Sequence, residues 1–81
     1  MYAIELAPEF ARQIADLHPR RFKQIHLRIF ALQPNPRPPD CAMLDLERYI
    51  VRSGPYAIYY NIDDSRRMVR ILLLEETEET E

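Results

Sequence analysis

The sequence predicts an α+β domain in which a helical hairpin packs on one face of a mostly antiparallel sheet. Three observations lead to this prediction: two amphipathic helical patterns that each begin at a proline, a proline-rich connector, and three later segments rich in tyrosine, isoleucine and valine. With 81 residues, the chain can build one hydrophobic core but not two independent ones. The predicted element order is βααβββ.

The N-terminal part predicts one strand and two helices. Residues 2–6 carry apolar side chains at every second position, which is typical of a strand with one buried face. Pro8 and Pro19 each suit the first turn of a helix, where the missing N–H is no loss. The joint between the helices is short, so they must be antiparallel. Their predicted apolar stripes are Phe10, Ile14 and Leu17 in the first helix and Phe22, Ile25, Ile29 and Leu32 in the second.

The C-terminal half predicts a connector and a three-stranded meander. Residues 33–40 contain four of the seven prolines, so the second helix ends by residue 33. Strands are predicted over residues 47–52, 56–62 and 68–74. The intervening turns hold the only glycine, at position 54, and a polar tip at residues 63–66. Such short connections favour consecutive antiparallel strands.

The charges are distributed unevenly along the chain. The formal net charge is −2, but five of the 13 acidic residues lie in the last seven positions. The first 74 residues therefore carry a net charge of about +3. We expect a domain over residues 1–74 and an acidic tail over residues 75–81, which either folds back over the basic body or stays solvated. A mildly basic body favours a polyanionic or an acidic protein partner without separating the two.

The composition argues against several classes of protein. One cysteine forms no internal disulfide and no signal-peptide pattern opens the sequence, so we expect the reducing cytoplasm. The longest apolar run, residues 71–74, is far below the roughly 20 residues of a membrane-spanning helix, so no membrane association is expected. His18, His26 and Cys41 have no zinc-site spacing, and neither a metal nor a cofactor is expected.

Two stretches of the sequence carry a resemblance to known proteins. Residues 35–39 read NPRPP, and residues 48–64 read RYIVRSGPYAIYYNIDD. Together with the order of the predicted elements, these stretches resemble the RelE/ParE superfamily of toxins from type II toxin–antitoxin systems. The resemblance covers about residues 2–74 and implies a RelE-like fold.

The resemblance implies a toxin that a cognate antitoxin protein holds inactive. RelE-like members cut mRNA on the ribosome, and ParE-like members inhibit DNA gyrase. The basic residues on the second strand of the family's nucleases are matched here by Arg48 and Arg52. Ala57 stands where an arginine is usual, and residues 75–77 read EET where basic and aromatic residues are usual. The resemblance therefore implies a toxin with weakened or lost mRNA endonuclease activity.

Cleavage of RNA by its own 2′-hydroxyl needs a proton acceptor, a proton donor and cations near the phosphate. The candidate catalytic residues are Arg48, Arg52 and Glu47, and the candidate RNA-binding residues are Arg48, Arg52, Arg70 and Tyr59. Neighbours on a strand point to opposite faces, so Glu47 and Arg48 are not expected to share a site without a bulge. The alternative is that these arginines are ordinary solvated strand residues.

Further alternatives concern the target and the partners. Three alternatives to a toxin with weakened activity remain open: an active ribosome-dependent mRNA interferase, a ParE-like gyrase inhibitor, and a non-enzymatic interaction module. Ribosome and mRNA are partners only under the RelE-like alternatives. The helix face that carries Arg21 and Arg28 is predicted to bind an acidic antitoxin segment. Tyr59 is the candidate surface aromatic for contact with a base, with an antitoxin helix, or with a second copy in a homodimer.

Overall fold

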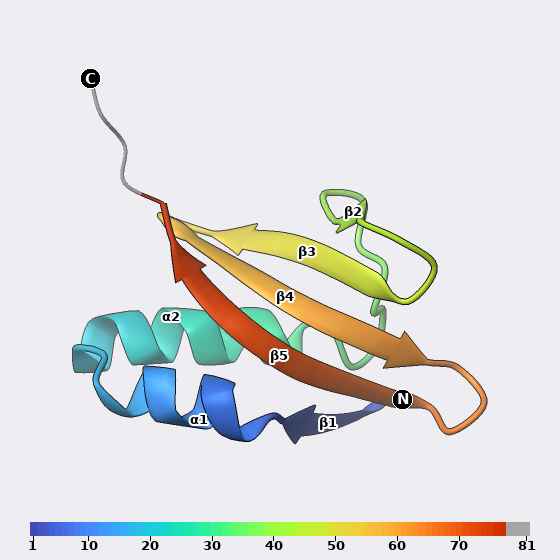
Figure 1. Cartoon of the computed structure of the whole chain (residues 1–81), viewed down its shortest axis with the longest axis horizontal. Helices are drawn as coiled ribbons and strands as arrows, with labels where there is room; N and C mark the ends of the chain where they lie inside the picture. The colour runs from blue at the N-terminus through green and yellow to red at the C-terminus, as the bar shows by residue number, and fades with distance from the viewer. Residues whose placement is uncertain (78–81) are drawn as a thin grey trace.

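The structure is a computed structural model that describes residues 1–77, in which two helices pack on one face of a five-stranded sheet (Figure 1). The elements are β1 (Ala3–Leu6), α1 (Pro8–Ala15), α2 (Pro19–Phe30), β2 (Ala42–Met43), β3 (Arg48–Ser53), β4 (Tyr56–Asp63) and β5 (Met68–Glu76). The strand order is β1-β5-β4-β3-β2. Only the β1–β5 pair is parallel among these described strands. The predicted α+β class with a mostly antiparallel sheet is confirmed.

The helices begin where the prolines predict. Pro8 and Pro19 occupy the first turns of α1 and α2, and the His18 ring Nδ1 accepts a hydrogen bond of 3.1 Å from the backbone N–H of Arg20. Helix α1 ends at Ala15, two residues before the predicted end. Neither described helix is long and apolar enough to cross a bilayer.

The core lies between the helical hairpin and the sheet. The predicted stripes supply Phe10, Ile25, Ile29 and Leu32, which are all buried. Phe22 is 40% exposed, so the second stripe is buried only from Ile25 onward. The sheet contributes Tyr49, Val51, Tyr56, Ile58, Tyr60, Ile62, Val69, Ile71 and Leu74. The expected inward face of β4 is confirmed.

Strand β5 is longer and less regular than predicted. Tyr59 pairs with Leu73 and Tyr60 pairs with Ile71, so one residue of β5 is left over as a β-bulge. The bulge lets Leu74 reach the core, where plain alternation from Ile71 would not place it. The strand then continues to residue 76, so residues 75 and 76 of the predicted tail belong to the sheet. Residues 78–81 of that tail lie outside the described residues.

The proline-rich connector is fastened to the sheet through polar contacts. The Tyr60 hydroxyl donates a hydrogen bond of 2.8 Å to the carbonyl of Pro36. The Arg37 guanidinium donates to both carboxylate oxygens of Asp64 at 3.2 and 2.8 Å, and to the Tyr49 hydroxyl at 3.0 Å. The connector is therefore held to β3, to β4 and to the turn after β4. We call these contacts the connector network.

The N-terminus joins the connector network through Asp64. The Tyr2 hydroxyl donates a hydrogen bond of 2.6 Å to Asp64 Oδ1. The hydrogen bonds from Arg37 and then from Tyr2 stabilise the ionised carboxylate, and they lower the pKa of Asp64 from 3.8 to about 2. One aspartate thus links three segments that are far apart in the sequence.

Candidate functional site

The candidate site lies on the sheet face opposite the two helices, which we call the open face (Figure 1). Cross-strand pairing arranges its side chains in three rows. The first row contains Arg48, Asn61, Arg70 and Glu5, the second contains Ile50, Tyr59 and Leu73, and the third contains Arg52, Ala57 and Glu75. The open face therefore has an apolar middle row with charged rows on either side.

Arg48 is tied to an acidic residue in the loop before its strand. Its guanidinium Nε lies 2.9 Å from Asp45 Oδ2. The other oxygen of Asp45 accepts the backbone N–H groups of Glu47 and Arg48 at 3.0 and 2.9 Å. These backbone hydrogen bonds and then the Arg48 side chain lower the pKa of Asp45 below its ordinary value. The ionised form of this carboxylate is therefore stabilised beside the candidate phosphate ligand.

The other candidate RNA-binding residues also have partners within the protein. Arg70 pairs with Glu5 at 3.3 Å, and Arg52 donates a hydrogen bond of 2.9 Å to the hydroxyl of Thr77. The Tyr59 hydroxyl donates a hydrogen bond of 2.6 Å to Glu75 Oε1, which raises the pKa of Tyr59. Three of the four candidate residues are thus bound to acids. Exposed pairs of this kind are worth little and can exchange partners, but the acids weaken the positive potential.

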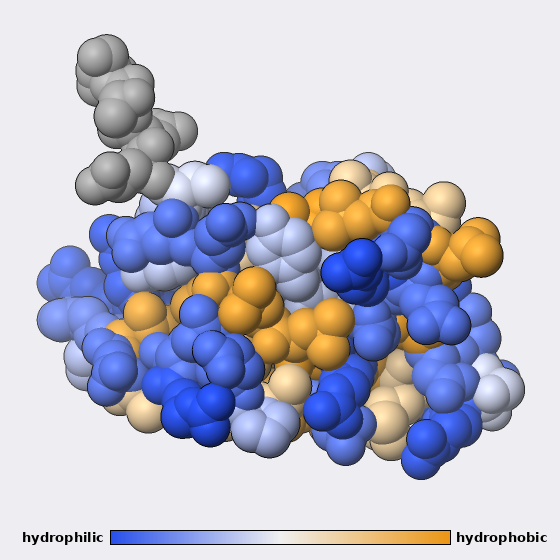
Figure 2. Space-filling model, in the orientation of Figure 1, coloured by the Kyte–Doolittle hydropathy of each residue, from blue (hydrophilic) through white to orange (hydrophobic). Residues whose placement is uncertain are grey.

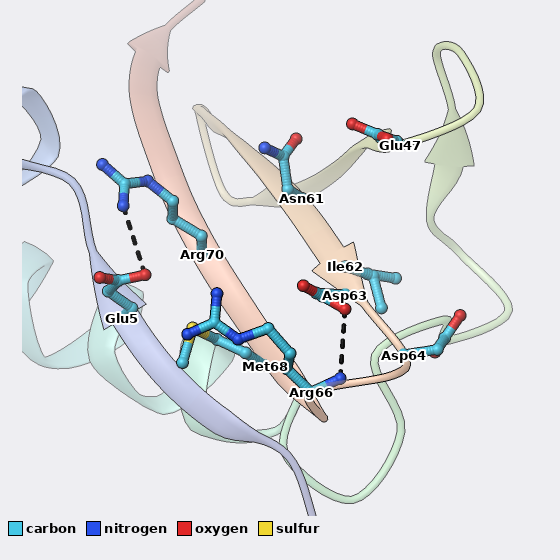
Figure 3. Close-up of a pocket in the computed structure, with 9 residues that line it drawn as sticks. All are labelled: Glu5, Glu47, Asn61, Ile62, Asp63, Asp64, Arg66, Met68 and Arg70. Atoms are coloured by element: carbon cyan, nitrogen blue, oxygen red, sulfur yellow. Dashed lines mark hydrogen bonds and ion pairs between the residues drawn. The ribbon is translucent and has the colours of Figure 1, made fainter.

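Two shallow hollows lie at the row that contains Asn61. One, of about 410 Å³, is lined by residues that include Glu47, Arg48 and Asn61. The other, of about 390 Å³, is lined by Glu47, Asn61 and Arg70 together with the charged residues drawn in Figure 3. Glu47 and Arg48 line the first hollow together, although they were expected to share a site only with a bulge. Glu47 precedes β3, so strand alternation does not apply to it.

The structure brings only part of the predicted catalytic set together. Glu47 and Arg48 meet at one hollow, whereas Arg52 lies two residues further along β3, opposite Ala57. His18 and His26, on the helical side, offer no proton donor to this face. Among residues 1–77, no group of three or more His, Cys, Asp or Glu side chains is arranged to hold a metal ion. Of the predicted catalytic set, the structure thus brings together one carboxylate, on Glu47, and one cation, on Arg48, which is paired with Asp45.

Asn61 is a member of the site that sequence reasoning did not single out. Its side-chain oxygen Oδ1 is buried and has no hydrogen-bond donor among the described residues. The residue lines both hollows, between Arg48 on β3 and Arg70 on β5. Alternation along β4 does place it on the open face with Tyr59, and this is the signal that could have found it.

The predicted antitoxin-binding arginines on α2 differ in their environment. The Arg21 guanidinium lies 5.8 Å from the centre of the Tyr56 ring and is exposed. Arg28 donates a hydrogen bond of 3.1 Å to the carbonyl of Arg52 and forms an ion pair with Asp40. Its side chain is only 24% exposed, so Arg28 fastens α2 to β3 rather than extending freely into solvent.

The helical side also has an apolar groove of about 210 Å³ between β1, α1 and α2. Its lining includes Leu6, Phe22, His26 and Phe30. The His26 ring stacks on Phe22 with 5.5 Å between ring centres and meets Phe30 edge-on at 4.4 Å. Leu6, Phe22 and Phe30 are each at least 40% exposed, so this groove is an uncovered apolar surface.

No protein-family model and no curated protein matches the chain. Among solved structures, the chain is similar to the isolated RelE toxin of Escherichia coli, with a TM-score of 0.87 and 14% identity over 100% of this chain and 89% of the toxin. It is also similar to a chain of the archaeal RelE–RelB complex from Pyrococcus horikoshii, with a TM-score of 0.83 and 19% identity over 98% of both chains.

A third similar structure is the toxin–antitoxin complex RelBE2 from Mycobacterium tuberculosis. The TM-score is 0.82, with 24% identity over 93% of this chain and 96% of the matched chain. These values establish that the chain has the RelE fold, as the sequence resemblance predicted. At such low identity, the activity has to be argued from the residues of the open face.

Proposed function

We propose that the chain is the toxin of a type II toxin–antitoxin system, that it acts in the cytoplasm, and that its mRNA endonuclease activity is weakened or lost. The main support for this proposal is the set of residue types in the third row of the open face. Arg52 on β3 is paired with Ala57 on β4, and Ala57 is paired in turn with Glu75 on β5, where an RNA-cleaving site needs further cations. A small side chain and a carboxylate at these positions cannot stabilise charge that develops on a phosphate.

The pairing of the remaining cations supports the same proposal. Asp45 and Glu5 neutralise Arg48 and Arg70, and Glu47 adds a further negative charge beside them. RNA would have to displace these acids before its phosphates reached the guanidinium groups. Glu47 remains the candidate proton acceptor, but the open face provides no matching proton donor from a histidine. We therefore expect weak RNA binding and slow cleavage.

The proposed partner is a cognate antitoxin. Several solved chains with this fold were determined in RelB complexes, and the chain has an uncovered apolar groove beside the basic outer face of α2. An amphipathic antitoxin helix could place apolar side chains in the groove and acidic ones near Arg21. Arg28 would contribute by holding α2 in place, because its guanidinium already has two protein partners.

The proposal is tested by inducing the chain in bacteria, with and without the neighbouring gene, and by assaying mRNA cleavage on purified ribosomes. We expect cleavage at least about 100-fold slower than that by Escherichia coli RelE, the usual effect of losing one transition-state cation. We also expect the neighbouring gene product to co-purify. Cleavage at the rate of Escherichia coli RelE would show the active interferase instead. Inhibition of DNA supercoiling would support the gyrase alternative.

A matched pair of variants tests the role of the third row. Glu75→Arg removes the acid at the β5 end of the row that contains Arg52, and we expect tighter binding of a short RNA by about tenfold at low salt. Glu76→Arg makes the same charge change at the adjacent position, which pairs with Tyr56 and belongs to the other face. Equal effects of the two substitutions would mean that overall charge, rather than this site, controls RNA binding.

A further inference from the structure

The turn between β4 and β5 contains a strained backbone position. Arg67 has a φ of +52°, and among the described residues Gly54 is the only other residue with a positive φ. A residue with a Cβ atom is disfavoured in this left-handed region, where glycine and asparagine are the usual choices. Strain that persists at an exposed position indicates a role for the side chain itself.

The fold uses the backbone of Arg67 but not its guanidinium group. The backbone N–H donates to the carbonyl of Asp64 at 3.3 Å, and the Arg67 carbonyl accepts a hydrogen bond of 2.9 Å from the N–H of Ala3. Glycine or asparagine would make the same backbone contacts without the strain. Within residues 1–77, Arg66 and Arg67 form no ion pair, although five other arginines do.

The two acids of the same turn already have hydrogen-bond donors. Asp63 Oδ1 accepts hydrogen bonds from the Ser65 hydroxyl at 2.9 Å and from the backbone N–H of Arg66 at 3.2 Å, the second of which is drawn in Figure 3. Asp64 is bound within the connector network. The carboxylates therefore shape the turn and fasten it to the connector, and the two guanidinium groups keep their donors for a ligand from outside.

The turn is exposed and polar. Residues 64–67 are all exposed, and Figure 1 shows the turn, in orange, projecting beyond the ends of the strands. The lower right of Figure 2, where the turn lies, is largely hydrophilic. A protein partner buries apolar side chains at the centre of its interface, and residues 64–67 offer none. A phosphodiester backbone needs only cations that can approach it closely.

We propose that this turn binds the phosphodiester backbone of a nucleic acid through Arg66 and Arg67. The planar guanidinium group can bond two phosphate oxygens at once. Because residues 63–67 hold two acids as well as two arginines, the attraction acts at short range, and binding is weak and sensitive to salt. The turn lies outside the three rows of the open face, so the inference goes beyond the proposed function and does not depend on mRNA cleavage.

The test follows the fluorescence anisotropy of a labelled RNA duplex of about 12 base pairs during titration with the full chain at low salt. A DNA duplex of the same sequence shows whether the site accepts any phosphodiester backbone or RNA alone. We expect Arg67→Asn and Arg66→Gln each to weaken binding by about fivefold and to reduce the salt dependence by about one phosphate contact. Arg12→Gln, which removes an exposed charge from α1, is the matched control, with an expected change below about twofold.

The stability of Arg67→Asn separates binding from folding. Because asparagine adopts the left-handed region more easily than arginine, we expect the urea midpoint to stay the same or to rise while nucleic-acid binding falls. A lower midpoint would show that the Arg67 side chain stabilises the fold and would remove the argument from strain. The proposal is also overturned if neither duplex binds, if the control weakens binding as much as the turn variants, or if hexaglutamate peptide binds more tightly than both duplexes.

Discussion

Arginine has two different roles in this molecule, in the connector network and on the open face. Arg37 donates to both oxygens of Asp64 and to Tyr49, and its guanidinium lies 5.3 Å from the centre of the Tyr49 ring. Arg48 and Arg70 each pair with one acid at the surface. The difference shows that the number of partners and the contact with the buried Tyr49 ring, not the residue type, decide whether an arginine holds the fold or stays available.

Two neighbouring tyrosines on β4 show the same difference between a side chain that holds the fold and one on the open face. Tyr60 is fully buried and donates to the carbonyl of Pro36 in the connector. Tyr59, one residue earlier, is half-buried on the open face and donates to the Glu75 carboxylate. Burial and then the nearby Cys41 raise the pKa of Tyr60, whereas the neighbouring carboxylate is the main cause for Tyr59. The first contact is structural, and the second can be exchanged.

The largest expected effect is the loss of the Tyr60 ring. Tyr60→Ala should lower the free energy of unfolding by about 3–5 kcal/mol, because it leaves a cavity and breaks the contact with Pro36. Tyr60→Phe should cost about 1–2 kcal/mol through the hydrogen bond alone. Urea denaturation followed by circular dichroism measures both. Tyr59→Phe is the control, with an expected change below about 0.5 kcal/mol.

The next largest effect is expected from a substitution at the centre of the connector network. Arg37→Leu should lower the free energy of unfolding by about 1–2 kcal/mol, because three hydrogen bonds and the packing on Tyr49 are lost together. The expected loss of unfolding free energy is modest because the Arg37 side chain is 44% exposed. Thermal unfolding measures it. If Arg37→Leu unfolds at the temperature of the unchanged chain, the connector network does not stabilise the fold.

The pH dependence of stability reports on Asp64. Its pKa falls from 3.8 to about 2 on folding, so the stabilising contribution is present above about pH 4 and is lost as the pH falls through 2. Asp64→Asn should therefore reduce the loss of stability between pH 5 and pH 2, as measured by the urea midpoint. Asp45 and Asp63 titrate in the same direction and remain as a background in both proteins. An unchanged slope for Asp64→Asn would contradict the assignment.

The smallest effect is expected on the open face. Arg48→Leu should change the free energy of unfolding by less than about 0.5 kcal/mol, because its single ion pair is exposed to solvent. The comparison with Arg37→Leu under the same conditions measures the difference between the two regions. A cost of Arg48→Leu as large as that of Arg37→Leu would show that this arginine also holds the fold.

Much of the fold could be predicted because its signals are local. The prolines at positions 8 and 19 mark the helix starts, and alternation predicts which face of β4 is buried. The two-residue strand β2 could not be predicted, because Ala42 and Met43 have no strand pattern and become a strand only by pairing with β3. Arg48 and Arg52 were identified from the resemblance and Arg70 from its position on a predicted strand, but the side chains that they contact were not predicted.

The sequence by itself determined the helical hairpin, the meander, and the replacement of expected cations by Ala57 and the C-terminal glutamates. These features depend on residue types and on spacings of a few positions. Only the tertiary structure decided that β1 lies parallel to β5, that Asp64 joins Tyr2 to Arg37, and that Asn61 faces a hollow without a donor. The reason is physical: such contacts join residues that are distant in the chain, and no local pattern specifies which distant residues meet.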